Sequence, residues 1–370
     1  MAIMTRIPTG PSQPKENPMT ALDQPELSPI FIVGCPRSGT TLLRTIIASH
    51  SRLIIAPESH FLNYWVKEYG QLDLNKPEDL QSFWADFSKS QRFGYFQLNA
   101  DDLLQKLKAQ DEISFRAIFQ LLLSEYAAAR QKPRWGEKTP AHYDFLETLL
   151  DWFPQARVLW LVRDPRAVVA SLLQVEWSSN YTYANAYYWL SSARLYREKW
   201  QQESRVMLLK YEDLVADPAA GTDKICAFLG EAVEPEMLTR RSEKDVPNLH
   251  AGGWAKRHLQ QVMQPIGQGA VEKWRSQLSS TQIAIIEHIT RDAMGFYGYE
   301  PITRKLSGWQ KFYLGLSQKL DRAGDRWQTL RSRFSSGPSL AARRIGATPQ
   351  APSSSTPSSS TPSRSVATKG

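Results

Sequence analysis

The hydrophobic positions of this chain form short apolar runs separated by longer stretches with helical spacing. Runs that predict strands lie at Ile30–Val33, Leu53–Ala56, Arg134–Glu137, Val158–Val162 and Val206–Leu209. The run Val158–Val162 contains no polar residue, which is typical of a strand buried on both faces of a parallel sheet. Helices are expected from about Thr40 to Ser49, from Pro165 and from about Pro218. This alternation predicts an α/β fold with a doubly wound, mainly parallel sheet.

A helical insertion is predicted between the second and third strands, over residues 60–130. Turn signals interrupt it at residues 75–77 and 99–102, and apolar residues from Phe115 to Tyr126 recur on one helical face. The insertion carries no motif that identifies a ligand.

The two ends of the chain differ in composition from its middle. Residues 1–28 are polar and Pro-rich, residues 346–370 are rich in Ser, Thr and Pro, and both segments are expected to be disordered. One domain is predicted over 29–302, followed by a basic amphipathic helical extension over 303–345. The apolar stripe of that extension consists of Trp309, Phe312, Tyr313, Leu316, Leu320, Trp327 and Leu330.

The net charge of +8 belongs to the extension and the tail. Residues 304–344 contain ten Lys and Arg against two Asp and Glu, and Arg364 and Lys369 add two positive charges. Residues 1–303 therefore carry a net charge of −2. We expect no nucleic-acid partner for the domain, and peripheral membrane contact through 304–344 stays open as an alternative to a solvated or docked helix.

Composition limits the cell compartment and the kind of site. The only cysteines are Cys35 and Cys226, which excludes a disulfide scaffold and fits a reducing compartment. The six histidines show no metal-ligand spacing, so no metal site is predicted. The sequence has no signal-peptide core and no apolar run long enough to span a bilayer. We therefore expect a cytoplasmic protein, with peripheral attachment to a membrane as the alternative.

The first predicted strand leads into a loop that resembles a phosphate-binding P-loop. Gly34 and Gly39 have the required spacing, but Thr40 stands where a P-loop has lysine. Backbone N–H groups at the start of the next helix can still bind an anion. Arg37, inside the loop, offers a planar set of donors in place of the missing lysine.

Charged and hydroxyl-bearing residues follow every predicted strand. They are Arg37, Ser38, Thr40 and Thr41 after the first strand, Glu58 after the second, Lys138 after the third, Arg163 and Asp164 after the fourth, and Tyr211 after the fifth. Ligands of parallel sheets bind at the carboxyl ends of the strands. The pattern predicts an anion site at that edge with a candidate base beside it.

Over residues 29–300 the sequence resembles the sulfotransferase family, and within it the branch that includes tyrosylprotein sulfotransferases. The segment 36–41 is similar to the loop that binds the 5′-phosphosulfate of 3′-phosphoadenylyl sulfate. The segment 162–167, continuing to Ser171, is similar to the family's 3′-phosphate-binding segment. Segments 209–214 and 271–275 resemble further landmarks of the family. The resemblance implies that 3′-phosphoadenylyl sulfate is the cosubstrate, that no metal takes part, and that the insertion lies on the acceptor side. The residues expected to bind the cosubstrate are Pro36, Arg37, Ser38, Gly39, Thr40, Thr41, Arg163, Ser171 and Tyr211.

The resemblance also implies catalytic roles. Glu58 corresponds to the base of the tyrosylprotein branch and would take a proton from an acceptor hydroxyl or amine, while Arg37 and Lys138 would stabilise charge on the bridging oxygen. His142 stays open as an alternative base, because small-molecule sulfotransferases place a histidine next to the matching lysine. His258 stands near the position of a serine usual in the branch, and its role is left open.

Two other functions remain in competition with sulfuryl transfer. A P-loop kinase or hydrolase would need the missing lysine and a magnesium-binding aspartate, for which Asp164 is the only obvious candidate. A non-catalytic module would bind nucleotide or membrane without turnover. The acceptor cannot be deduced from the sequence: protein tyrosine, a glycan, a lipid and a small alcohol all remain candidates.

Overall fold

The computed structural model describes residues 28–239, 266–303, 306–312 and 314–316. Its centre is a five-stranded sheet in the order β2-β3-β1-β4-β5, and every pair of neighbouring strands is parallel. The strands are β1 (Ile30–Gly34), β2 (Leu53–Ala56), β3 (Arg134–Lys138), β4 (Arg157–Val162) and β5 (Val206–Lys210). The predicted α/β fold and all five predicted strands are confirmed, with bounds that differ by at most one residue.

Helices connect the strands on both faces of the sheet. Those before β4 are α1 (Thr40–Ala48), η3 (Phe61–Val66), α2 (Lys67–Tyr69), α3 (Pro77–Lys89), α4 (Gln91–Gly94), α5 (Ala100–Lys108), α6 (Phe115–Ala128), η4 (Pro140–Phe145) and α7 (Leu146–Trp152). Those after β4 are α8 (Pro165–Leu172), α9 (Thr182–Leu195), η5 (Tyr196–Trp200), α10 (Tyr211–Ala216), α11 (Pro218–Leu229), α12 (Glu236–Thr239), η7 (Gln268–Ala270), α14 (Trp274–Gln277) and α15 (Ser280–Phe296). The segment 60–130 is helical, as predicted.

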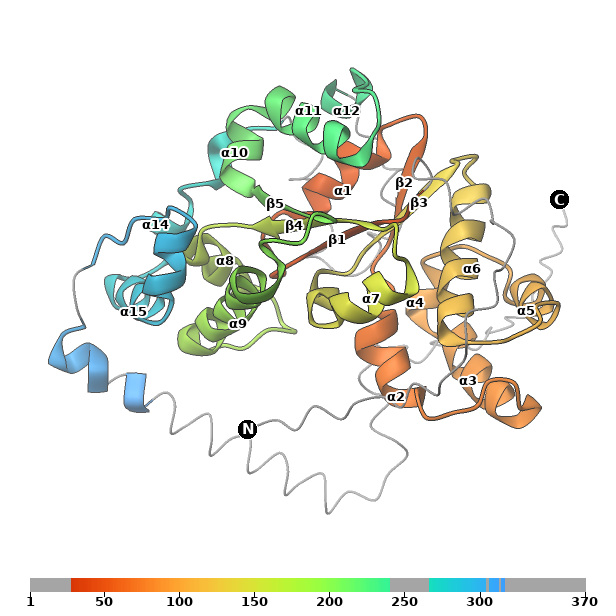
Figure 1. Ribbon diagram of the computed structural model, residues 1–370. Coiled ribbons are helices and arrows are strands. Elements are labelled where there is room, and N and C mark those ends of the chain that lie inside the picture. The colour runs from red at the N-terminus through yellow and green to blue at the C-terminus, as the bar shows by residue number, and fades with distance from the viewer. Residues whose placement is uncertain (1–27, 240–265, 304–305, 313, 317–370) are drawn as a thin grey trace, which may run out of the picture.

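The alternation of side chains along the strands divides the core into two layers. Ile30 and Ile32 of β1 pack with α1, α10, α11 and α12 on one face of the sheet, as Figure 1 shows above it. Phe31 and Val33 face the opposite layer, which includes α6, α7, α8 and α9. Burial on both faces explains why β1 and β4 read as continuous apolar runs.

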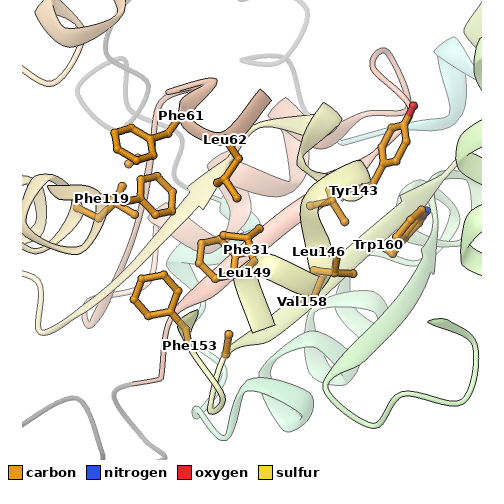
Figure 2. Packing of buried hydrophobic residues seen from close by; sticks show 14 of the residues in the cluster. Phe31, Phe61, Leu62, Phe119, Tyr143, Leu146, Leu149, Phe153, Val158 and Trp160 are labelled. Carbon is orange, nitrogen blue, oxygen red and sulfur yellow. The ribbon is translucent and has the colours of Figure 1, made fainter. Parts of the chain in front are cut away.

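Aromatic rings fasten the helical insertion to the sheet (Figure 2). The ring centroid of Phe31 lies 6.3 Å from that of Phe119 on α6 and 5.8 Å from that of Phe153. Phe119 in turn stacks on Phe61 of η3, with their centroids 4.9 Å apart. The insertion thus shares the core of the sheet and fixes the chain that follows β2.

Two helices begin directly beneath the carboxyl edge of the sheet. Asp164 caps α8 by accepting a hydrogen bond from the N–H of Arg166, and Pro165 occupies the first turn. α1 starts after Gly39, which has a left-handed backbone and no side chain with which to cap the helix. Its first N–H groups therefore lack a capping side chain from that residue and point toward the same edge.

Part of the predicted C-terminal extension lies within the described residues. Residues 308–312 and 314–316 are helical, Leu306 is buried, and Trp309, Phe312 and Leu316 are exposed. Other residues of the stripe, namely Tyr313, Leu320, Trp327 and Leu330, fall outside the described residues, as do 1–27, 346–370 and His258. None of the helices in the described part of the chain is both long and apolar enough to cross a bilayer.

Candidate active site

The loop between β1 and α1 depends on two glycines. A Cβ atom on Gly34 would lie 2.2 Å from the carbonyl oxygen of Leu161, and one on Gly39 would lie 2.4 Å from Cδ2 of Tyr211. Both glycines have positive φ, at 135° and 100°, and so does Arg37 at 73°. The loop is therefore pressed against β4 and the residue after β5, and it turns the Arg37 backbone into a left-handed conformation.

The predicted phosphate-binding residues contact one another. Nε of Arg37 donates a 2.9 Å hydrogen bond to Oγ of Ser171 on α8. Arg163, at the end of β4, donates through Nη1 to the carbonyl of Arg37 at 3.4 Å and through Nη2 to the carbonyl of Ala270 at 2.7 Å. The Arg163 guanidinium also lies 4.2 Å from the centroid of the Tyr211 ring. The two anion sites expected from the sequence are thus adjacent parts of one cationic group.

Two buried polar atoms in this group have no partner among the residues that the structure describes, namely Nε of Arg163 and Oγ of Ser38. Buried polar groups of folded proteins are nearly always hydrogen-bonded. A donor pair of this kind, beside the start of α1, fits the oxygens of a phosphate or sulfate group.

The other members of the predicted binding set lie in the loop itself or in the first turn of α1. Thr40 and Ser38 are buried, whereas Pro36, Gly39 and Thr41 are partly accessible. The loop therefore offers both backbone and side-chain donors to a ligand that approaches from solvent.

Glu58, two residues after the end of β2, contacts Lys138, the last residue of β3. Oε1 of Glu58 forms an ion pair with Nζ of Lys138, and Oε2 lies 3.2 Å from Nε2 of His60. Lys138 is buried, while the Glu58 side chain is 36% exposed. Burial by itself would raise the pKa of Glu58, but Lys138 and His60 outweigh it and hold this pKa well below its usual range.

Arg37 connects the base region with the phosphate region. Burial lowers the pKa of Arg37, the charge of Glu58 raises it, and that of Arg163 lowers it. Arg37 contacts Arg163, and it follows β1, which pairs in parallel with β3, the strand that ends at Lys138. The structure thus brings the three predicted catalytic residues, Arg37, Glu58 and Lys138, to the same edge of the sheet.

A buried carboxylate supports the turn that carries Glu58. Glu137, which precedes Lys138 on β3, accepts hydrogen bonds from the N–H of Ser59 at 3.0 Å and from its Oγ at 2.9 Å. Thr139 donates to the same oxygen, and Oγ1 of Thr139 accepts the N–H of His60 at 3.2 Å. His60 has a φ of 50°, so these bonds hold a turn that its own backbone preference does not favour.

His142, the alternative base, belongs to this support. Its ring is fully buried, with Nδ1 3.2 Å from Oε2 of Glu137 and Nε2 accepting the N–H of Leu62 at 3.3 Å. Nε2 thus accepts a backbone N–H, and Nδ1 faces the Glu137 carboxylate within ion-pair distance. The geometry favours Glu58, whose carboxylate is accessible, over His142.

Sequence reasoning missed three residues of the site: His60, Glu137 and Arg92. Arg92 comes from the insertion and donates through Nη1 to the carbonyl of Glu58 at 3.3 Å. In the sequence, only Glu137 gave a signal, because a carboxylate in the middle of a buried strand needs hydrogen-bonding partners. Arg92 gave no signal, because its contact joins segments 34 residues apart.

Both carboxylate oxygens of Asp164 are engaged in contacts within the protein. It caps α8, and its carboxylate forms an ion pair with Arg166 at 2.6 Å, which in turn pairs with Glu287 at 2.8 Å. In the described ranges, no group of three or more His, Cys, Asp or Glu side chains is arranged to hold a metal ion.

Comparison with known proteins identifies the family. A model of the sulfotransferase family matches residues 29–235, more than half of the chain. The chain belongs to the sulfotransferase family. The match covers all five strands, the loop before α1, and the positions of Glu58, Lys138 and Arg163.

Individual relatives are distant. A protein-tyrosine sulfotransferase of Drosophila melanogaster is 26% identical over 290 residues, 75% of this chain. This chain spans 52% of that protein's length. The omega-hydroxy-beta-dihydromenaquinone-9 sulfotransferase Stf3 of Mycobacterium bovis is 25% identical over 250 residues, 55% of this chain and 62% of that protein.

Among solved structures, the sulfotransferase domain of the Synechococcus PCC 7002 olefin synthase is similar to this sulfotransferase-family chain. Its TM-score is 0.55 at 25% identity, and the alignment covers 74% of this chain and 94% of that one. The solved domain confirms the sulfotransferase fold for the central part of the molecule.

Proposed function

We propose that this chain transfers a sulfuryl group from 3′-phosphoadenylyl sulfate to an acceptor hydroxyl or amine, with Glu58 as general base. The observation that carries the proposal is the ion pair of Glu58 with Lys138 at the carboxyl edge of the sheet. The neighbouring loop after β1 brings Arg37 to the same edge, where it contacts Ser171 and Arg163. Family membership supports both the reaction and the donor.

The donor would lie along the cationic group. The loop 36–41 and the first N–H groups of α1 suit the 5′-phosphosulfate, and Arg163 with Ser171 suits the 3′-phosphate. Nε of Arg163 and Oγ of Ser38 support this placement, because each is buried and has no partner in the described part of the chain. Tyr211 would set the plane of Arg163 by stacking beneath it.

The residues can carry out an in-line displacement. The oxygen of the acceptor hydroxyl forms a bond to sulfur while Glu58 accepts the hydroxyl proton. At the same time, the bond between sulfur and the bridging oxygen of the donor breaks. The electron pair of that bond leaves on the nucleotide product, which carries 3′- and 5′-phosphates. Arg37 and Lys138 stabilise the negative charge that develops there.

The ion pair between Lys138 and Glu58 implies an order of steps, in which the donor binds before Glu58 becomes an effective base. While Lys138 is paired with Glu58, it holds the pKa of the carboxylate low and makes Glu58 a weak base. When Lys138 turns to the bridging oxygen of the donor, Glu58 loses its strongest counter-charge and becomes more basic. Donor binding would thus prepare the base for the acceptor.

The acceptor itself stays open. One relative is named for protein tyrosine and another for a menaquinone derivative, so the family's acceptors differ widely. We propose the insertion as the acceptor side, because Arg92 reaches from α4 to the backbone of Glu58. Protein tyrosine, a glycan, a lipid and a small alcohol remain the candidate acceptors.

The competing nucleotide kinase or hydrolase has less support. Thr40 replaces the phosphate-binding lysine, and the Asp164 carboxylate is engaged by Arg166 and by the cap of α8. A non-catalytic module would not need an accessible carboxylate paired with a buried lysine.

Calorimetry with adenosine 3′,5′-bisphosphate in the presence of EDTA tests the donor site. Arg163→Lys retains a positive charge but loses the planar fork, and it should weaken binding by about 10- to 150-fold, the equivalent of roughly 1.5–3 kcal/mol. Adenosine 5′-phosphate, which lacks the 3′-phosphate, should bind wild type weakly and should lose little from Arg163→Lys. Equal binding of both nucleotides to wild type, or tighter binding of ATP with Mg²⁺, would contradict the assignment.

A further inference from the structure

The chain after α15 forms a short helix with two different apolar faces. Leu306, two residues before the helix, is 7% exposed and packs with Tyr183, Ala284 and Ile285, and Leu314 of the helix lies against the same cluster. Leu306 and the Leu314 side of the helix thus attach this segment to α9 and α15 of the domain.

The outer face is apolar as well, but it is open to solvent. Trp309 is 68% exposed, Phe312 is 59% exposed and Leu316 is 44% exposed. Their spacing of three and then four residues places them on one side of a helix. The rings of Trp309 and Phe312 lie together, with centroids 5.5 Å apart. We call these three side chains the outer face.

The positive charge in and around this helix indicates that the outer face binds a negatively charged surface. Lys311 is exposed within the helix, and the sequence from 304 to 344 has ten Lys and Arg against two Asp and Glu. The rest of the chain up to residue 303 carries a net charge of −2. Aromatic side chains next to Lys and Arg are the residues that anchor proteins at an anionic bilayer surface.

We propose that the outer face of Trp309, Phe312 and Leu316 docks the protein on an anionic lipid membrane. The aromatic pair enters the headgroup region, Lys311 meets anionic headgroups, and the positive charge of the surrounding sequence attracts the same surface. A second copy of the chain fits this face less well, because two segments of net charge +8 would repel each other. The proposal is independent of the reaction assigned to the active site.

Co-sedimentation of the full chain with vesicles tests the docking surface. Wild type should bind vesicles of phosphatidylcholine with phosphatidylserine, should bind pure phosphatidylcholine weakly, and should dissociate as salt is raised. The double variant Trp309→Ser with Phe312→Ser should lower the fraction bound at limiting lipid by about tenfold. The matched control is Trp177→Ser with Tyr187→Ser, which removes two aromatic residues that are 52% and 50% exposed elsewhere.

The melting temperature and the affinity for adenosine 3′,5′-bisphosphate should be the same in all three proteins, which excludes misfolding as the cause. Wild type that fails to bind phosphatidylserine vesicles would overturn the proposal. Equal loss in the Trp177 and Tyr187 control would also overturn it. Self-association in solution that disappears only in the Trp309 and Phe312 variant would assign the face to a second copy instead.

Discussion

Replacing Glu137 with glutamine tests whether a buried carboxylate holds the turn that presents Glu58. Gln keeps the size of the side chain but removes its charge and exchanges one acceptor oxygen for a donor. The Glu137 carboxylate accepts from the N–H and Oγ of Ser59 and from Thr139, and it lies 3.2 Å from Nδ1 of His142. The Gln amide has only one acceptor oxygen, so it can keep some of these hydrogen bonds but not all of them.

The expected loss of stability follows from this set of contacts. Leaving a buried hydrogen-bonding group unsatisfied costs about 1–3 kcal/mol, and more where the partner was charged. Gln can still accept one of the hydrogen bonds, so we expect a cost of about 3 kcal/mol. For a domain of this size the melting temperature should fall by roughly 6–12 °C. Glu203→Gln is the matched control, because Glu203 pairs with Arg205 at 2.9 Å at a partly exposed site and should cost less than about 1 kcal/mol.

The pH dependence of this difference has a definite sign. Burial raises the pKa of Glu137, but the neighbouring His142 and the hydrogen bonds from Thr139 and Ser59 outweigh it and leave the pKa below its usual value. A depressed carboxylate pKa contributes stability above the pKa of the unfolded state, and this contribution is lost as the pH falls through the folded-state pKa. The stability gap between wild type and Glu137→Gln should therefore be full at pH 7 and should shrink as the pH falls below about 4.5.

Urea denaturation at several pH values measures the gap, and turnover measures its consequence for Glu58. Glu137→Gln should lower turnover while leaving the affinity for adenosine 3′,5′-bisphosphate nearly unchanged, because the nucleotide residues lie on other strands. A cost no larger than that of Glu203→Gln, or a gap that does not depend on pH, would refute the reasoning.

Two further substitutions test the catalytic base and the nucleotide-binding loop separately. Glu58→Gln should reduce turnover by about 10²–10⁴ without weakening the binding of the nucleotide product, and full activity would remove Glu58 from the role of base. Gly39→Ala should abolish nucleotide binding measured by calorimetry, because its Cβ would lie 2.4 Å from the ring of Tyr211 at a φ of 100°. Gly94→Ala, where nothing lies within 4 Å, is the matched control, and the account of the loop fails if the two variants bind nucleotide equally.

The sequence predicted the parts of this protein that depend on local patterns. Apolar runs located the five strands, and the parallel topology then placed Glu58, Lys138 and Arg163 at one edge. The pairing of Glu58 with Lys138 was not predictable, because it joins strand ends that are 80 residues apart in the chain. The same holds for the hydrogen bond of Arg37 to Ser171, which spans 134 residues. Such contacts depend on the register and twist of the sheet rather than on any local spacing.

The stripe of the C-terminal extension shows another limit of periodicity. Helical spacing correctly placed Trp309 and Phe312 on one face, but spacing alone does not say which face meets the core. The structure turns Leu306 and Leu314 inward and leaves the aromatic pair outside. An amphipathic pattern thus identifies a helix more reliably than it identifies its partner.

Transfer of radiolabelled sulfuryl from 3′-phosphoadenylyl sulfate tests the central claim most directly. Wild type and Glu58→Gln would be compared in EDTA against tyrosine peptides, glycans, lipid alcohols and small phenols or alcohols. The account predicts label on at least one acceptor class with wild type, and a rate lower by about 10²–10⁴ with Glu58→Gln. Transfer at equal rates by both proteins would contradict the role of Glu58. No transfer to any acceptor class, together with hydrolysis of ATP in a parallel assay with Mg²⁺ in place of EDTA, would contradict the function.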